Sequence, residues 1–333
     1  MSLESGRIAK IASGHRLLAF SFWTGQLPEI SRLHFLTVAR TLPAGGRYVL
    51  FIDKANISSS MLELLARCEV DIAAIDLPQL LQENGLAKLL WRTPLSSHWQ
   101  FVHNILRDRP RLARLSRLGH YHQTMRFTPR YNILLGGPPT TSVRLSNYVR
   151  VLISSVIKTH TLYMDLDFAF PRPLDWIHQH GSFVYSWEHR GFANSALMSV
   201  KADSPIKKGA LIDVLKREGT GRPWILFSEQ NCRTCGLDIL SCDRLDPLWS
   251  KTNPSRPKFS EFFAHDANSE ETLRKLKGDF DAIHWHNRWK ETPELGSPYD
   301  LWLRELTTPS TRETEAGRDP LAGAALREVS WTN

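Results

Sequence analysis

The sequence predicts an α/β fold whose sheet begins with parallel strands. Three apolar segments in the first 80 residues, 16–24, 48–53 and 70–75, read as strands, with helical segments between them. Strands and helices that alternate at this spacing are typical of a parallel sheet with crossover helices. A further apolar run, Tyr163 to Phe168, predicts another strand, although two acidic residues interrupt it.

The connections between the first strands carry helix signals. The first strand ends in a turn at Gly25, and Pro28 stands where a helix to about Leu42 begins, as proline prefers the first turn. Serines 58–60 can cap a second helix, which ends near Cys68. Residues 16–80 are therefore expected to form a nucleotide-binding βαβαβ half.

Residues 78–140 are divided by prolines into short helical segments and contain a cluster of arginines. Seven arginines lie in the 107–130 region, at positions 107, 109, 111, 114, 117, 126 and 130. They form either a solvated basic helix face or a surface that contacts an anionic membrane or a phosphorylated acceptor. Both interpretations stay open.

A clearer helix begins at Thr141 or Ser142. Its apolar residues fall at helical spacing and should face the core: Leu145, Val149, Leu152 and Val156. Ser146, Asn147 and Arg150 share another face, because they lie three and four residues apart. The acidic strand follows at once, so Arg150 is placed near the acids, either as an ion-pair partner or as a ligand contact.

The two acidic residues are Asp165 and Asp167. Side chains two apart on a strand point to the same face, so both carboxylates could meet one ligand. Carboxylate oxygens suit hard cations such as Mn²⁺ and Mg²⁺. Two acids at a strand end are more often simply solvated, so the neighbouring residues must decide.

The remainder continues the α/β pattern. Strands are expected at 183–187, 196–200 and 239–242, a helix at 204–218 and irregular chain at 219–236. Residues 282–289 hold two histidines and two tryptophans, and the chain from 307 to 333 reads as a loosely held tail. We expect a single domain over 1–306, with 141–300 as its second half.

Composition and net charge limit the classes of binding partner that this chain is expected to have. The chain has 333 residues and a formal net charge of +8, which favours an anionic partner. It contains no recognisable nucleic-acid-binding module, so nucleic acid is not expected. We find no signal peptide and no apolar stretch long enough to span a bilayer, so a cytoplasmic protein, in peripheral contact with the inner face of the membrane, is expected. Cys232, Cys235 and Cys242 read as reduced cysteines and match no common zinc module.

Four ordered segments resemble metal-dependent glycosyltransferases of the GT-A class. They are Phe20-Ser21-Phe22-Trp23-Thr24-Gly25-Gln26-Leu27-Pro28, Ser146-Asn147-Tyr148-Val149-Arg150, Tyr163-Met164-Asp165-Leu166-Asp167 and His284-Trp285-His286-Asn287. They are similar to the "I-H-x-I-W-x-G-x-x-P", "S-D-x-x-R", "Y-L-D-x-D" and "H-x-W-N" segments of glycosyltransferase family 32. Relatives in that family include α-1,4-galactosyltransferases, capsule and lipopolysaccharide enzymes and the clostridial glucosylating toxins.

The resemblance implies a Rossmann-like, nucleotide-sugar-binding GT-A fold with a mixed central sheet and additional helices. It implies a hexosyltransferase that uses Mn²⁺ or Mg²⁺ and a nucleotide-sugar donor, expected to be UDP-linked, and transfers to a glycan or glycolipid acceptor with retention of configuration. Bacterial surface polysaccharide or lipopolysaccharide synthesis is the expected setting.

The resemblance also implies residue roles. The expected metal ligands are Asp165, Asp167, His284 and His286, with Asp165, Asp167 and Arg150 as catalytic residues. The expected donor contacts are Phe22, Trp23, Ser146, Asn147, Arg150, Asp165 and Trp285, and the expected acceptor contacts are Glu188, Asn194 and Glu229. Trp23 would stack on the base, and Trp285 or Trp289 would cover the site.

The chain departs from the family pattern in three places. Asn147 stands where the family has aspartate, Thr159-His160-Thr161 replaces a glycine pair, and Phe227-Ser228-Glu229-Gln230 replaces "G-P". These departures leave the donor sugar open, and they keep a second class of function in view. That class is a non-catalytic scaffold or polyanion-binding protein on a glycosyltransferase fold. A nucleotidyltransferase is less favoured, because no phosphate-binding glycine loop follows the first strand.

Overall fold

A computed structural model gives the arrangement of the chain. It describes residues 3–24, 27–54, 57, 59–68, 70–86, 142–187 (the first four as backbone only), 192–218, 222–249, 257–286 and 288–308. The arginine cluster of 107–130, Glu188 and most of the expected tail lie outside the described residues.

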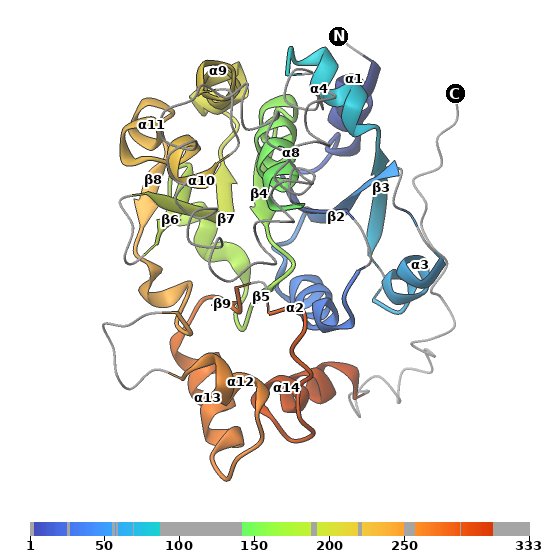
Figure 1. Cartoon of the computed structure of the whole chain (residues 1–333), viewed down its shortest axis with the longest axis vertical. Helices are drawn as coiled ribbons and strands as arrows, with labels where there is room; N and C mark the ends of the chain where they lie inside the picture. The colour runs from blue at the N-terminus through green and yellow to red at the C-terminus, as the bar shows by residue number, and fades with distance from the viewer. Residues whose placement is uncertain are drawn as a thin grey trace, which may run out of the picture.

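The strands of the described chain form one large and one small sheet (Figure 1). The large sheet contains β1 (Leu17–Trp23), β2 (Gly46–Asp53), β3 (Asp71–Ile75), β4 (His160–Met164), β6 (Phe183–Ser186), β7 (Ala193–Val200) and β8 (Asp238–Leu240). Among the described residues its order is β3-β2-β1-β4-β7-β6-β8. The four strands from β3 to β4 are parallel, and β7 runs antiparallel to both of its neighbours. The predicted α/β class with a mixed central sheet and a parallel, Rossmann-like half is confirmed.

Helices cover the sheet on both faces and at one end. They are α1 (Leu3–Ile11), α2 (Arg32–Thr41), α3 (Ser59–Ala66), α4 (Leu77–Glu83), α8 (Ser142–Val156), α9 (Ala210–Glu218), α10 (Pro223–Leu226), α11 (Glu229–Thr234), α12 (Phe259–Phe263), α13 (Ser269–Asp279) and α14 (Pro298–Thr307). Single 3-10 turns are η1 (Glu29–Ser31), η4 (Leu174–Gln179), η5 (Pro205–Lys208) and η6 (Cys242–Arg244).

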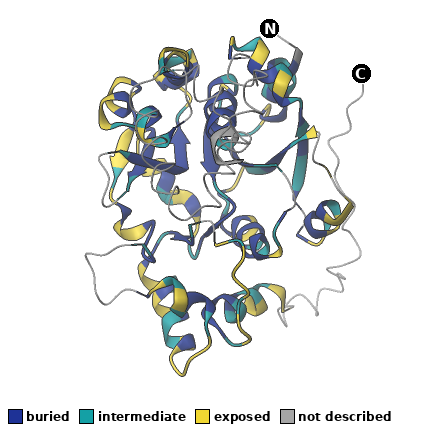
Figure 2. Cartoon of the chain, in the orientation of Figure 1, coloured by how far each residue is buried: buried dark blue, intermediate teal, exposed yellow. Residues whose placement is uncertain are grey.

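Strand alternation divides the apolar residues between two cores. Leu18, Phe20 and Phe22 of β1 pack on the side of α1, α8 and α9, while Leu17 and Ala19 point to the opposite side, toward α2. Successive side chains of a strand point to opposite faces, and both faces of this sheet are covered. The central strands therefore read as largely apolar runs, and Figure 2 shows the middle of the sheet buried between the helices, while β8 at its edge is partly exposed.

The short β5 (Phe168–Ala169) and β9 (Ile283–His284) form the small antiparallel sheet. This sheet ties the chain after β4 to the last part of the described chain, next to the layer of α12, α13 and α14 at the lower end of Figure 1. Its position matters for function, because it brings residues 284–286 beside residues 165–167, more than 100 positions away in sequence.

Most predicted elements are confirmed within a few residues, and three details are corrected. The acidic strand ends at Met164, so Asp165 and Asp167 lie in the connection between β4 and β5 rather than in the strand. The helix expected at 204–218 is broken at Gly209, which has a φ of 100°. The irregular stretch 219–236 contains α10, which begins at Pro223, and α11, which the Ser228 side chain caps.

The described residues contain no helix that is long and apolar enough to cross a bilayer.

Candidate active site

The candidate site lies where the parallel strands end. Trp23 closes β1, and Asp165 directly follows β4, the neighbouring strand. The carboxyl ends of parallel strands meet at one edge of a sheet, where open α/β sheets bind their ligands. The backbone N–H of Asp165 donates to Ala196 of β7 at 2.7 Å, which fixes the chain just as it leaves the strand.

Asp165 is held by an arginine and a tyrosine. Nη2 of Arg150 lies 3.0 Å from Oδ1 of Asp165, and the Tyr163 hydroxyl donates to the same oxygen. The Arg150 side chain is 4% exposed and that of Asp165 is 29% exposed, so the carboxylate still reaches solvent. Burial and the nearby Asp167 raise the pKa of Asp165, against the opposing charge of Arg150.

The other donors of Arg150 also contact protein groups. Nη1 donates to the carbonyl and hydroxyl of Ser195 at 2.5 and 2.7 Å, and Nη2 donates to the Ser146 hydroxyl at 3.0 Å. Nε donates to the Ser146 carbonyl at 3.3 Å. Because each nitrogen of the guanidinium donates to a protein group, Arg150 orients the Asp165 carboxylate. Its predicted contact with a donor phosphate stays a prediction.

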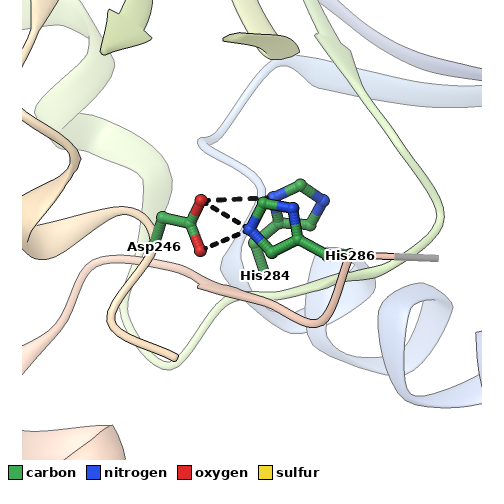
Figure 3. Close-up of side chains that lie close together, drawn as sticks. All are labelled: Asp246, His284 and His286. Carbon is green, nitrogen blue, oxygen red and sulfur yellow. Dashed lines mark hydrogen bonds and ion pairs between the residues drawn. The ribbon is translucent and has the colours of Figure 1, made fainter. Parts of the chain in front are cut away.

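The second group of charges contains Asp246, His284 and His286 (Figure 3). Nε2 of His286 lies 2.8 and 2.7 Å from the two carboxylate oxygens of Asp246. Nδ1 of His284 lies 3.6 Å from Asp246, and the centroids of the two imidazole rings lie 3.7 Å apart. Figure 3 shows the two rings side by side next to the Asp246 carboxylate. One ligand atom from each of the three residues falls within 4.8 Å of the others.

Asp167 joins this group from the acidic segment. Its Oδ1 lies 3.2 Å from Nε2 of His284, and both side chains are almost fully buried. The N–H of Trp285 donates to the Asp167 carbonyl at 3.0 Å, so β5, β9 and their flanking residues are in register. The two chain segments that carry the resemblance therefore meet at one point.

Electrostatics within the group follow from this burial. Burial by itself lowers the pKa of His284, but Asp167 and Asp246 raise it to about 10. Burial and the charge of His284 lower the pKa of His286. Burial raises the pKa of Asp246, but the two histidines outweigh it and hold that pKa below its ordinary value. A positive charge on His284 thus sits between two carboxylates, at the position where a cation would be favoured.

The donor set fits a divalent cation. Two imidazoles and two carboxylates converge from three segments of the chain, and such nitrogen and oxygen ligands are those that divalent metal ions use. The hydroxyl of Tyr185 lies 2.8 Å from Nδ1 of His284, so a neighbouring group orients this ring, as is usual for a ligating histidine. The predicted ligands Asp167, His284 and His286 lie together, and Asp246 joins them.

The backbone at His286 is unusual. This residue has a φ of 47°, in the left-handed region that a non-glycine residue enters only when its surroundings hold it there. Its ring packs against Trp249 at 4.5 Å and Phe259 at 5.7 Å between ring centroids. The aromatic packing and the Asp246 carboxylate together hold the imidazole in the group.

Two of the expected donor contacts, Trp23 and Phe22, lie on opposite faces of β1. Trp23 is half-buried and meets Trp289 edge to face at 5.1 Å between ring centroids. Phe22 points to the opposite face and is buried in the core under α8, so it contacts no ligand at this edge. Ser146 accepts a hydrogen bond from Arg150, and Asn147 is buried beside it.

Trp285 has a different position from the one expected. Its side chain is fully buried and packs against Phe262 and Tyr299 in the core formed by α12, α13 and α14. A covering role for Trp285 is therefore wrong, because its ring is enclosed by protein. Trp289, which touches Trp23, lies where such a role remains open.

Of the three expected acceptor contacts, the structure describes Asn194 and Glu229. Asn194 is buried in β7, where its Oδ1 accepts from the N–H of Ala196 at 2.9 Å. Glu229 is exposed at the start of α11 and pairs with Arg233 at 3.0 Å. Glu188 lies outside the described residues. The acceptor role of all three stays a prediction.

Sequence reasoning missed Asp246, Tyr163 and Ser195 as site residues. Asp246 stands in the segment Arg244-Leu245-Asp246-Pro247, with no motif around it, and its neighbours His284 and His286 are about 40 positions away. Tyr163 belongs to the quoted motif, and its position before an acid was the available signal. Ser195 acts through its carbonyl as well as its hydroxyl, which no residue pattern reveals.

A hollow of about 450 Å³ lies beside α12. Lys258, Phe259, Phe263, Arg288 and Glu294 are among its lining residues. Its lining mixes both signs of charge and includes none of the aspartates or histidines of the candidate site, although Phe259 also packs against the His286 ring.

This chain is similar to known proteins in structure but not detectably in sequence. No family model matches the sequence, and no curated protein matches it. Among solved structures the chain is similar to the bifunctional glycosyltransferase WbbM, with 9% identity and a TM-score of 0.45 over 91% of this chain and 51% of that one. The chain thus spans about half the length of WbbM.

Two further structures are similar. An active-site mutant of LgtC has 10% identity and a TM-score of 0.42 over 90% of this chain and 99% of its own. Mouse xyloside xylosyltransferase 1 has 10% identity and a TM-score of 0.41 over 84% and 99%. These likenesses are to glycosyltransferases, as the sequence resemblance anticipates, while glycosyltransferase family 32 itself is not confirmed. These TM-scores lie below 0.5, so the α/β fold rests on the strand order of the described residues.

Proposed function

We propose that this protein is a metal-dependent glycosyltransferase. It would move a hexose from a nucleotide sugar, UDP-linked, to a glycan or glycolipid acceptor. One observation carries the proposal: Asp165 and Asp167 follow β4 at the carboxyl edge of the sheet, and Asp167 lies 3.2 Å from His284, which is grouped with Asp246 and His286. Carboxylate and imidazole groups at the end of parallel strands could hold a cation that in turn binds a diphosphate.

Asp167, Asp246, His284 and His286 would hold the cation. Bound there, the cation would offset the negative charge that develops on the leaving diphosphate. A set that mixes imidazole with carboxylate favours a transition-metal ion such as Mn²⁺ over Mg²⁺, which takes oxygen ligands and retains its water.

The remaining residues would position Asp165 and the nucleotide base. Arg150 and Tyr163 fix the carboxylate of Asp165, which is 29% exposed. Trp23 offers an aromatic face at the end of β1, next to Trp289, for the nucleotide base. Retention of configuration follows from the resemblance, so we assign no general base.

The same resemblance suggests the biological setting. We place the reaction in bacterial surface polysaccharide or lipopolysaccharide assembly, at the inner face of the cytoplasmic membrane. The net charge of +8 supports contact with an anionic surface.

The test is thermal unfolding against a panel of UDP- and GDP-sugars, with and without Mn²⁺. A ligand that binds only the native state raises the midpoint by mass action. We expect a rise that needs both Mn²⁺ and one nucleotide sugar, and its loss in Asp167→Asn. Asp203→Asn, in an exposed turn after β7, is the matched control and should keep the full rise.

One outcome would reject the proposed function, and another would reject only the assigned metal site. If no donor shifts the midpoint with the metal present, the function moves to a non-catalytic scaffold or a polyanion binder. If Asp167→Asn retains full metal-dependent transfer, the assigned metal site is wrong even though the activity stands.

A further inference from the structure

A chain of aromatic side chains leads from the candidate metal site to the surface. Starting at His286, ring centroids are 4.5 Å apart to Trp249, 6.2 Å from Trp249 to Trp187, 5.4 Å from Trp187 to Phe192 and 6.5 Å from Phe192 to Trp224. We name Trp249, Trp187, Phe192 and Trp224 the aromatic path. Binding of the metal, the base and the donor phosphates leaves it unused.

The path ends in an exposed ring. Trp249, Trp187 and Phe192 are half-buried, while Trp224 is 50% exposed. Burying an aromatic side chain is favourable, so a row of rings that ends in an exposed tryptophan is a common mark of a binding surface. Trp224 belongs to α10, whose sequence continues directly into the bridge between Phe192 and Ser228.

The strand order places the path opposite the nucleotide side. Trp23 lies at the end of β1, the aspartates follow the end of β4, and Trp187 follows the end of β6. Phe192 precedes the start of β7, which lies at the same edge of the sheet because β7 runs antiparallel to β4 and β6. In the order β1-β4-β7-β6 the aspartates therefore separate Trp23 from the path. If the donor base lies at Trp23, the second substrate must approach from the side of the path.

The chemistry along the path fits sugar rings. Aromatic faces are electron-rich and pack well against the C–H faces of a sugar, while the sugar hydroxyls need polar partners at the edges. The guanidinium of Arg222 lies 5.5 Å from the Trp224 ring, and the carboxylate of Glu229 is exposed nearby in sequence.

We propose that the aromatic path binds an oligosaccharide acceptor, with Trp224 contacting an outer sugar and Trp249 the sugar nearest the metal site. This inference rests on the proposed function for the direction of approach, but the binding itself can be measured without any reaction. A lipid chain is the poorer occupant, because charged and polar groups accompany the rings.

The experiment titrates the full chain with lactose, maltotetraose, cellotetraose and N-acetylchitotetraose, followed by saturation-transfer NMR and tryptophan fluorescence. We expect at least one to bind, and Trp224→Ala to raise its Kd about ten-fold, the factor that corresponds to about 1.4 kcal/mol. Trp224→Phe, which keeps an aromatic face, should recover most of the affinity. Leu295→Ala, at an apolar residue with 78% exposure, is the matched control and should bind as the wild type does.

Failure of this inference is distinct from failure of the proposed function. If none of the four oligosaccharides binds, or if Trp224→Ala binds as tightly as the wild type, the acceptor path is wrong. Binding to vesicles of anionic phospholipid that depends on Trp224, without oligosaccharide binding, would also overturn it in favour of a membrane contact. The Mn²⁺-dependent donor shift should be unchanged in Trp224→Ala, so its absence in the wild type would reject only the proposed function.

Discussion

The carboxylate of Asp246 connects the two histidines of the candidate metal site. It accepts from His286 through both oxygens and lies 3.6 Å from His284, while its own side chain is 2% exposed. A buried carboxylate with two imidazole neighbours sets their orientation as well as the charge of the site. Asp246 should therefore be as important for metal binding as the aspartates of the acidic segment.

Asp246→Asn should weaken Mn²⁺ binding by at least about ten-fold, because it removes a negatively charged ligand from a buried site. The measurement is Mn²⁺ titration by calorimetry or electron paramagnetic resonance. Asp243→Asn, three positions earlier and exposed in η6, is the matched control and should bind Mn²⁺ normally. Unchanged affinity in Asp246→Asn would exclude this residue from the metal site.

Arg150 positions its neighbours through the planar shape of its guanidinium. Its planar fork reaches Ser146, Ser195 and Asp165 at once, which a single ammonium group cannot do. Arg150→Lys should lower the free energy of unfolding by about 3 kcal/mol, since buried acceptors lose their donors. Urea unfolding measures this change.

Arg244→Lys provides the control for Arg150→Lys. Arg244 pairs with Asp281 at 2.7 Å but is 57% exposed, so its replacement should change stability by no more than about 0.5 kcal/mol. Equal stability of Arg150→Lys and the wild type would mean that Arg150 does not organise the acidic segment.

Among the secondary-structure elements, the break between η5 and α9 shows how one residue redirects the chain. Gly209 has a φ of 100°, and a Cβ added there would meet nothing within 4 Å. Any cost of Gly209→Ala therefore comes from backbone conformation alone, which side chains with a Cβ disfavour.

Gly209→Ala should destabilise the protein by about 1–2 kcal/mol. Gly278→Ala is the opposite case, because Gly278 lies in α13 with ordinary helical geometry and open space around its Cβ position. It should stabilise by a few tenths to about 1 kcal/mol, since alanine is the better helix former. Thermal unfolding of both variants checks the pair, and equal signs would contradict the assignment of Gly209.

The stability of the whole molecule should depend on pH through His160, a buried histidine at the start of β4. His160 starts β4 and contacts Ser199 at 2.7 Å. Burial, with the charges of Lys201, His178 and Lys207, lowers its pKa from 6.5 to about 3. Between those pH values the unfolded chain binds a proton that the folded chain does not, so stability falls as the pH falls below about 6.5.

At pH near 5 this single residue should cost about 2 kcal/mol relative to neutral pH. His160→Gln keeps a polar side chain toward Ser199 but cannot titrate, so its stability should fall less steeply between neutral and acidic pH. Urea midpoints measured across that range test this, with His180→Gln, an exposed histidine on η4's C-terminal side, as the control. An unchanged slope in His160→Gln would mean that protonation of His160 is not what destabilises the protein in acid.

How far the sequence predicts the molecule differs between the sheet and the site. The strands from β1 to β3 were predicted within a few residues, because buried parallel strands are continuous apolar runs that helices separate. The acidic strand was placed too far along the chain, since Leu166 and Phe168 continue the apolar pattern although the chain turns after Met164. Short helices such as α10 and α11 were missed because four to six residues show no helical period.

By itself the sequence determined the α/β fold class and the approximate bounds of most strands. These features are local, because they show in the spacing of apolar residues and in capping residues. It placed Asp165 and Asp167 inside a strand, and it indicated His284 and His286 only through the family resemblance. The tertiary structure alone decided that Asp246 joins the histidines, that Trp285 is core, and that Arg150 uses its donors on Asp165 and two serines. Such facts depend on which distant segments become neighbours, and on how each side chain's hydrogen bonds are then satisfied, which only packing fixes.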